Sequence, residues 1–289
     1  MMPKVSVLLP SYNHERFVEA AVRSVMSQTG VDFELIVIDD GSSDASPRIL
    51  ANLQAEFGFT LIQRTNKGVV ATLTEALSMA RGRYVCTFSS DDMMPPERLK
   101  KQSDYLDAHP DAVACFGQVM PLFDDGSFGE MDERYLRSVP QVSFEESFLG
   151  KKALHGCAEM FVREKILAIG GYDGRYYFED YPLYLKILYN YGPQPVLDDV
   201  VCCYYREHGG NMHVNHDRIY REILRVLENY SEHPLYPEAV RCWKANWFSA
   251  VAAQSKLEAI RLIPKVISLS PKFWLRVPKL FIPRKLLKY

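Results

Sequence analysis

Three features that would assign a chain to a specific class of protein are missing from this sequence of 289 residues. It contains no run of about 18 or more apolar residues, which a simple transmembrane helix requires. The opening MMPKVSVLLP leads straight into a strand-like segment and lacks the apolar region of a secretory signal peptide. None of the six cysteines stands in a C-x-x-C pair, so neither a zinc site nor a disulfide framework is indicated. We therefore expect a reduced, cytoplasmic protein.

A large excess of charge of one sign is also missing, because the formal net charge is −2. The charge is nevertheless uneven along the chain. Residues 255–289 contain nine Lys and Arg and one acid, a net charge of +8, which leaves −10 for residues 1–254. This asymmetry indicates a partner for the basic tail. No RNA- or DNA-binding module is recognisable, so we expect no nucleic-acid partner.

The sequence does contain a regular alternation of strand-like and helix-like segments. Apolar, β-branched runs occupy residues 4–9, 33–38, 59–63, 83–88 and 112–120, and apolar residues at helical spacing occupy 15–28, 46–57, 69–80 and 96–108. Further segments predict a strand, a short helix and a Gly-Gly turn over 158–173, helices over 178–192, 219–230 and 239–253, and a strand over 195–208. The alternation predicts an α/β fold with a mostly parallel sheet covered by helices on both faces.

Two carboxylate pairs follow predicted strands of this sheet. Asp39–Asp40 comes after the second strand and Asp91–Asp92 after the fourth. Ligands of such sheets bind at the carboxyl ends of the strands. Two adjacent acids repel one another, and a nearby cation compensates for the repulsion. The pattern therefore indicates a site for a cation and its ligand at this edge of the sheet.

Four blocks of the sequence resemble the family-2 glycosyltransferases, which have the GT-A fold. The blocks are VSVLLPSYNHERFVEAAVRSVMSQT, ELIVIDDGSSD, TNKGVVATLTEALSMARGRYVCTFSSDD and FEDYPLYLKI, and the resemblance covers roughly residues 3–215. It implies a GT-A (Rossmann-like) catalytic domain over 1–215, with a nucleotide-binding half of about 1–120 and an acceptor-side half over 121–215. Residues 216–289 are then a C-terminal helical extension with a basic amphipathic tail.

The resemblance implies a nucleotide site after the first three strands. Asp40 would accept a hydrogen bond from uracil N3–H, Pro10, Tyr12 and Asn13 would line the nucleoside pocket, and Asn66, Lys67 and Gly68 would lie near the nucleotide. A helix that begins after Gly68 offers backbone N–H groups to an anion. The residues alone leave a simpler alternative open, in which DDGSSD is a turn, Asp44 caps the next helix and Gly68 makes a left-handed turn.

A divalent metal site is implied at the second carboxylate pair. Mn²⁺ or Mg²⁺ prefers hard oxygen ligands and would neutralise the diphosphate of the donor. The family pattern has another acid two positions before Asp91, where this chain has Ser89. This departure favours Asp92 as the metal ligand, with Asp91 on the ribose or on a metal-bound water, and His208 is a further candidate ligand. Helix capping by Asp92 ahead of Pro95 and Pro96 is the alternative.

The acid pair Glu179–Asp180 resembles the family's catalytic pair at the start of a helix. An inverting transfer needs a base that takes the proton of the acceptor hydroxyl, and the matching residue is Asp180, with Glu179 in support. His155, Gly156 and Arg206 are expected to line the acceptor and sugar pocket, and Arg206 could also neutralise phosphate charge. The alternative for the acid pair is a favourable interaction with the helix dipole.

The basic tail predicts an anionic membrane surface as partner, because Lys and Arg alternate with Phe273 and Trp274. Pro264, Pro271 and Pro278 lie seven residues apart and exclude one long helix. The alternative is a tail that packs on the body with a solvated Lys face. The membrane reading places the protein at the inner face of the cell membrane, acting on a saccharide or lipid-linked saccharide acceptor in cell-surface polysaccharide assembly.

Transfer of single sugars is favoured, because the Gln-x-x-Arg-Trp block and membrane helices of the processive synthases are both missing. Two other functions stay open. A nucleotidyltransferase should carry a Gly-rich basic loop after the first strand, where this chain has SYNHERF. A catalytically inactive, membrane-associated nucleotide-sugar-binding protein fits the departure at Ser89. Homo-oligomer formation is also left open.

Overall fold

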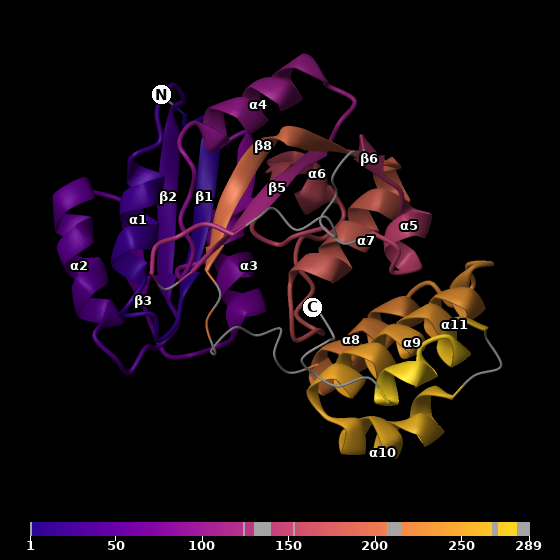
Figure 1. Cartoon of the computed structure of the whole chain (residues 1–289). Helices are drawn as coiled ribbons and strands as arrows, with labels where there is room; N and C mark the ends of the chain where they lie inside the picture. The colour runs from indigo at the N-terminus through magenta and orange to yellow at the C-terminus, as the bar shows by residue number, and fades with distance from the viewer. Residues whose placement is uncertain are drawn as a thin grey trace. The chain divides into compact units, whose positions relative to one another are not determined.

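The computed structural model describes residues 2–123, 125–129, 140–152, 154–206, 208, 216–267 and 271–281 (Figure 1). Asn211, which the resemblance grouped with His208, and the tail beyond residue 281 lie outside the described residues. The chain forms two compact units. The first comprises Met1–Phe144 and Lys152–His208, and the second comprises Glu145–Lys151 and Gly209–Tyr289.

The first unit is built on a sheet that has eight strands among the described residues, in the order β3-β2-β1-β4-β7-β5-β8-β6. The strands are β1 (Val5–Ser11), β2 (Phe33–Asp39), β3 (Thr60–Gln63), β4 (Tyr84–Thr87), β5 (Ala114–Leu122), β6 (Gln141–Val142), β7 (Glu159–Val162) and β8 (Gln194–Arg206). β1 pairs in parallel with both β2 and β4, and β7 runs antiparallel between β4 and β5. The prediction of a mostly parallel sheet is confirmed.

Helices lie on both faces of this sheet (Figure 1). They are α1 (Val18–Met26), α2 (Ser46–Phe57), α3 (Val69–Met79), α4 (Arg98–Ala108), α6 (Arg163–Ala168) and α7 (Asp180–Tyr191). The apolar stripes of α1, α2 and α4 share one core with Val5, Val7 and Leu9 of β1. Leu8, which alternates with them, points to the opposite face, where α3 packs on β1 and β2. The helices begin close to the predicted positions, and α2 starts at Ser46 with Pro47 in its first turn.

The second unit is helical in its described residues. It contains α8 (His216–Glu228), α9 (Tyr236–Gln254), α10 (Lys256–Val266), α11 (Pro271–Trp274) and the 3₁₀ turn η2 (Val277–Leu280), together with most of α5 (Phe144–Phe148). Phe248 of α9 packs with Phe273, Leu262 and Val266 in its core. The described C-terminal part consists of short elements, as predicted, with Pro271 and Pro278 at the starts of α11 and η2 and Pro264 inside α10. No helix in the described part of the chain is long and apolar enough to cross a membrane.

Residues 145–151 group with the second unit, whereas the sequence pattern placed them in the catalytic domain. Phe148 packs edge-on against Tyr230, with ring centroids 5.7 Å apart. Trp243 donates from Nε1 to the Phe148 carbonyl at 2.9 Å. These contacts join segments about a hundred positions apart, which local sequence patterns do not report.

Candidate functional site

Several of the predicted site residues lie at the carboxyl ends of three neighbouring strands. β1 lies between β2 and β4, so the loops that follow these three strands leave the sheet at one edge. The Asp40 amide donates to the Ser11 carbonyl at 2.8 Å, which holds the end of β2 against the end of β1. In an α/β sheet this edge is where ligands bind.

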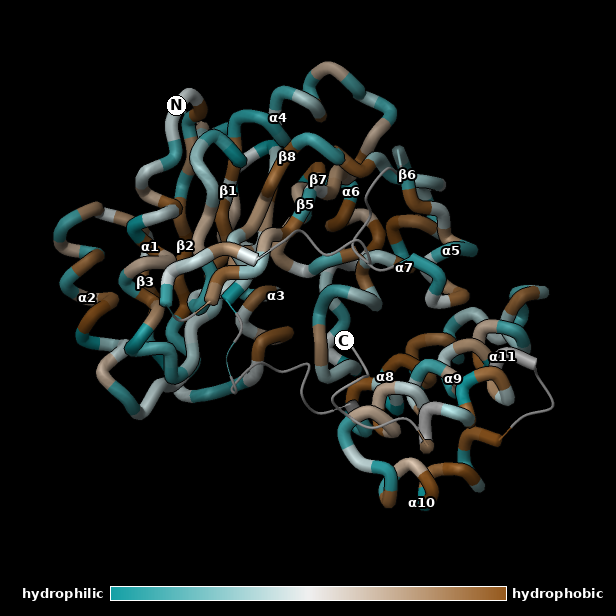
Figure 2. Tube along the Cα trace, viewed as in Figure 1, coloured by the Kyte–Doolittle hydropathy of each residue, from teal (hydrophilic) through white to brown (hydrophobic). Residues whose placement is uncertain are grey.

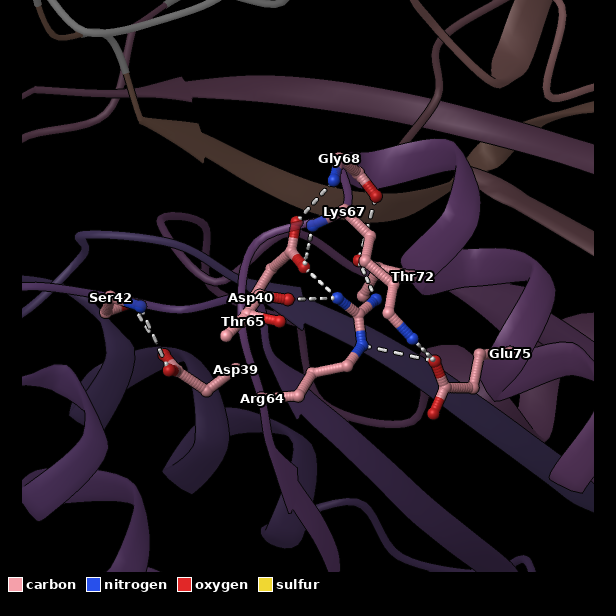
Figure 3. Close-up of polar contacts among 9 residues, drawn as sticks. All are labelled: Asp39, Asp40, Ser42, Arg64, Thr65, Lys67, Gly68, Thr72 and Glu75. Atoms are coloured by element: carbon pink, nitrogen blue, oxygen red, sulfur yellow. Dashed lines mark hydrogen bonds and ion pairs between the residues drawn. The ribbon is translucent and has the colours of Figure 1, made fainter.

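Asp40 is held in place by residues that follow β3 (Figure 3). Its carboxylate, 4% exposed, forms an ion pair with Arg64 and accepts hydrogen bonds from the amides of Lys67 at 2.9 Å and Gly68 at 2.8 Å. Gly41 makes this approach possible, because its φ is +79° and a Cβ there would lie 2.7 Å from the Asn66 amide nitrogen. A carboxylate offers about four lone-pair positions, so these three donors leave one for a ligand.

Arg64 was not identified from the sequence. It follows β3 directly and also contacts Glu75 Oε2 at 3.1 Å and Thr72 Oγ1 at 2.8 Å, which fixes the guanidinium beside Asp40 (Figure 3). The available signal was a basic residue at the end of the strand next to Asp40. Its pairing became visible only once β3 was placed beside β2.

The β1 and β2 loops are joined through Asn13. Asn13 adopts a left-handed φ of 54°, donates from its amide to Ser42 Oγ and accepts from the Ser43 amide at Oδ1, both at 2.8 Å. Tyr12 beside it is 49% exposed, and Pro10 is a partly buried residue of β1. These residues form an open surface next to Asp40.

Asp91 lies between two histidines. Its Oδ2 is 3.0 Å from His208 Nε2 and 3.8 Å from His14 Nε2, and its side chain is 13% exposed. One ligand atom from each of the three residues lies within 4.8 Å of the other two, a spacing that suits a shared metal ion. Burial lowers the pKa of His14, with His208 adding to the effect and Asp91 opposing it. His14 was not singled out from the sequence.

His208 is positioned by an aromatic neighbour. It stacks on Phe17 with ring centroids 4.8 Å apart, and the Arg206 guanidinium lies 5.1 Å from the centre of the same ring. Arg206 also donates from Nε to the Asp91 carbonyl at 3.0 Å. The structure therefore brings together Asp91, Arg206 and His208, all of which the sequence indicated.

Asp92 faces away from the two histidines. Its carboxylate is 1% exposed, accepts from the Arg206 amide at 2.8 Å through Oδ1, and lies in a buried group with Cys157 and Cys203. Its Oδ2 is buried without a hydrogen-bond partner among the described residues. Burial and the neighbouring Cys157 and Asp91 raise the pKa of Asp92 well above its usual value. Asp92 thus anchors the backbone that carries Arg206.

Asp180, the first residue of α7, lies against the segment that contains His155 and Gly156. A Cβ on Gly156 would be 3.1 Å from Asp180 Oδ2, so glycine leaves room for the carboxylate. Burial raises the pKa of Asp180, although the Tyr181 amide and His155 oppose the effect. Burial and the adjacent Asp180 raise the pKa of Glu179 to about 8. Raised carboxyl pKa values suit proton transfer near neutral pH.

His155 connects this acid pair with the end of β8. Its ring lies edge-on to Tyr205 with centroids 4.8 Å apart, and Nδ1 is 2.9 Å from Cys157 Sγ. Burial alone would raise the pKa of Cys157, but Cys203 and His155 lower it to about 5. Tyr205 precedes Arg206, so one strand end contacts the surroundings of both Asp180 and Asp91.

Comparison with known proteins identifies the family of this chain. The model of Glycosyl transferase family 2 matches residues 6–168, more than half of the sequence. The chain belongs to glycosyl transferase family 2. The family-2 match includes the strand ends that carry Asp40, Asp91 and Asp92.

Two relatives show how far this likeness extends. EpsE of Bacillus subtilis (strain 168) is 39% identical over 142 residues, which cover 48% of this chain and 50% of EpsE. The succinoglycan biosynthesis protein ExoO of Rhizobium meliloti (strain 1021) is 28% identical over 142 residues, which cover 49% of this chain and 41% of ExoO. The chain therefore spans half or less of the length of these family-2 relatives.

Solved structures confirm the GT-A fold. S. aureus TarS 1-349 in complex with UDP-GlcNAc has a TM-score of 0.67 and 19% identity, covering 96% of this chain and 80% of that one. The mannosyltransferase PcManGT from Pyrobaculum calidifontis, in complex with GDP-Man and Mn²⁺, has a TM-score of 0.61 and 19% identity, covering 97% and 85%. At 19% identity, these two likenesses show the fold of this chain and not its substrate.

Proposed function

We propose that this protein transfers a single sugar from a UDP-sugar to a hydroxyl of a saccharide or lipid-linked saccharide, with inversion at the anomeric carbon. The observation that supports the proposal is a series of contacts at the strand ends, in which Arg206 donates to the Asp91 carbonyl and the preceding Tyr205 packs on His155, which lies near Asp180. Asp40 with Arg64, Asp91 with His208, and Asp180 beside Gly156 offer the three functions that the reaction needs. Family membership favours this reaction over nucleotidyl transfer.

Asp40 and Arg64 would bind the base of the donor. Uracil presents an N–H between two carbonyl oxygens, which matches a carboxylate acceptor next to a guanidinium donor. Asp40 keeps one lone-pair position after its contacts with Arg64, Lys67 and Gly68. TarS was solved with UDP-GlcNAc and PcManGT with GDP-Man, so the fold accommodates either base, and the preference for uracil rests on the Asp40–Arg64 pair.

Asp91 and His208 would hold Mn²⁺ or Mg²⁺ beside the donor diphosphate, a role that the sequence assigned to Asp92. Exposure favours Asp91 over Asp92 as the metal ligand. A metal that binds a diphosphate needs open coordination positions, and the Asp91 side chain is 13% exposed, whereas Asp92 is 1% exposed. A bound divalent ion neutralises the charge that develops on the departing diphosphate. Arg206 adds a positive charge on the same side.

Asp180 would act as the general base. It takes the proton of the acceptor hydroxyl as that oxygen forms a bond to the anomeric carbon, and the bond from this carbon to the diphosphate oxygen breaks. Burial raises the proton affinity of Asp180, and Asp180 in turn raises that of Glu179 through repulsion between the two carboxylates. Gly156 and His155 border the carboxylate, and the missing side chain at Gly156 leaves room for Asp180 Oδ2.

The second unit would attach to an anionic membrane surface. Leu257, Ile260 and Ile267 are each at least half exposed, and their spacing of three and seven puts them along one side of α10 and its end. Figure 2 shows hydrophobic stretches along α10. Arg261 and Lys265 interrupt this stripe with positive charge. Such a face suits the boundary between lipid headgroups and acyl chains, where a lipid-linked acceptor in polysaccharide assembly would be found.

A nucleotide-sugar binding panel tests the function. UDP-, GDP- and TDP-sugars are added to the full chain with and without Mn²⁺, and the melting temperature is recorded. A ligand that binds the folded state raises it, and we expect the largest rise with UDP-sugars and Mn²⁺. Release of UDP from the best ligand then measures turnover. The absence of any rise with all three donor classes would refute the proposal.

A further inference from the structure

His14 occupies a position beside Asp91 to which the sequence assigned no chemistry. It follows β1, and its amide donates to Ser46 Oγ at 3.0 Å, which fixes the backbone. Its ring Nδ1 lies 2.7 Å from Ser90 Oγ, so this nitrogen is engaged with the residue next to Asp91. The other nitrogen, Nε2, points to Asp91 Oδ2 at 3.8 Å.

We propose that His14 is a protein ligand of the divalent cation, together with Asp91 and His208, and that it replaces the carboxylate missing at Ser89. This inference builds on the metal site of the proposed function. It adds a residue from the loop after β1 to a site otherwise formed by the segments that follow β4 and β8. The resulting donor set has two imidazole nitrogens and one carboxylate oxygen.

The spacing of the donor atoms supports a shared ion. Atoms bound to one ion at about 2.1 Å lie roughly 3.0 to 4.2 Å apart, depending on the geometry. Asp91 Oδ2 lies 3.0 Å from His208 Nε2 and 3.8 Å from His14 Nε2, both within this range. The rings of His14 and His208 meet edge-on with centroids 6.0 Å apart, so both can approach one point between them.

The remaining contacts of His14 are those of a metal ligand. A ligating histidine usually uses its second nitrogen in a hydrogen bond that orients the ring. Ser90 provides this bond for His14, and Phe17 supports the ring of His208 by stacking.

The donor set predicts which cation binds. Mg²⁺ strongly prefers oxygen ligands, whereas Mn²⁺ accepts imidazole more readily and Co²⁺ more readily still. Two histidines should therefore favour Mn²⁺ over Mg²⁺ by at least about tenfold in Kd, because ligand changes commonly alter metal affinity by 10- to 100-fold. Substitution His14→Asp would restore an all-carboxylate pair next to His208 and should reduce this preference.

The test uses Mn²⁺ and the full chain. Pulsed electron paramagnetic resonance of bound Mn²⁺ detects directly coordinated imidazole nitrogens, and we expect two in the unmodified protein and one in His14→Phe. The Kd of Mn²⁺, measured by titration, should rise at least tenfold in His14→Phe. His109→Phe is the matched control, because His109 is exposed at the end of α4 and should change neither quantity.

Competition with Mg²⁺ provides a second readout. The ratio of the Mg²⁺ and Mn²⁺ dissociation constants should fall in His14→Asp while Mn²⁺ still binds, which also shows that the variant is folded. A single coordinated nitrogen in the unmodified protein, or two in His14→Phe, would overturn the inference. Neither readout depends on sugar transfer, so a protein that coordinates Mn²⁺ through His14 but binds no nucleotide-sugar would refute only the proposed function.

Discussion

Asp40 and Arg64 form a nearly buried ion pair that connects the ends of the adjacent strands β2 and β3. The same carboxylate accepts the Lys67 and Gly68 amides at the start of α3. One acid therefore organises the loop that would face the nucleotide. The same carboxylate that stabilises this loop is the group that we propose binds the base.

The first prediction concerns this pair. Asp40→Ala should lower the free energy of unfolding by about 1–3 kcal/mol, because two partly buried backbone N–H groups lose their acceptor. UDP affinity should fall at least tenfold. Arg64→Met should weaken UDP binding similarly. Glu75→Gln is the control, since Glu75 contacts Arg64 without touching Asp40, and calorimetric titration with UDP should show little change. Unchanged UDP affinity in Asp40→Ala would contradict the assignment.

Removal of the proposed base should separate binding from chemistry. Asp180→Asn retains the shape of the side chain but cannot take a proton, so the transfer rate should fall by about 10²- to 10⁴-fold. Affinities for UDP and Mn²⁺ should stay within about twofold. Asp111→Asn, at an exposed position, serves as the control. Transfer at the normal rate by Asp180→Asn would show that another group takes the proton.

Glu179 should make stability depend on pH. Its pKa of about 8 in the folded protein exceeds its ordinary value of 4.5, so folding favours the protonated form. This contribution to stability is complete below pH 4.5 and is lost as the pH rises to about 8. The Gln side chain in Glu179→Gln cannot ionise. The melting temperature of this variant minus that of the unmodified protein should therefore increase as the pH rises from 5 to 9. Parallel melting curves over this range would argue against a buried, coupled carboxyl.

The two members of the second acid pair should behave differently. Asp91→Asn should raise the Kd of Mn²⁺ more than tenfold, because Asp91 lies beside His208 and His14. Asp92→Asn preserves an acceptor for the Arg206 amide and should leave Mn²⁺ affinity within about threefold. The opposite ranking, measured by titration, would restore Asp92 as the metal ligand.

The exposed stripe of α10 should control membrane binding. The double substitution Leu257→Ser and Ile260→Ser should reduce flotation with vesicles containing anionic phospholipid, since both side chains are about half exposed. A higher salt concentration should weaken vesicle binding, because it screens the charges of Arg261 and Lys265. Leu167→Ser removes an exposed apolar residue from the first unit and serves as the control. Equal flotation of the double variant would exclude α10 as the attachment surface.

The elements of the fold were largely predictable because their signals are local. Ser46 and Pro47 start α2, and Val69 follows Gly68 at the start of α3, as their sequence patterns indicated. Strand positions followed from apolar, β-branched runs, and the carboxyl-end position of both acid pairs followed from the parallel sheet. The resemblance then supplied the family, which the family model confirmed.

Sequence by itself determined where the strands end and which acids stand there, because apolar periodicity and turn residues act over a few positions. Only the tertiary structure decided which of these groups meet. Parallel pairing of β1 with β2 and β4 puts His14 beside Asp91, and β3 carries Arg64 to Asp40. Asp92 is buried against the Arg206 amide at the end of β8, whereas the adjacent Asp91 stays partly exposed. These contacts depend on strand order and register, which residues distant in the chain set jointly.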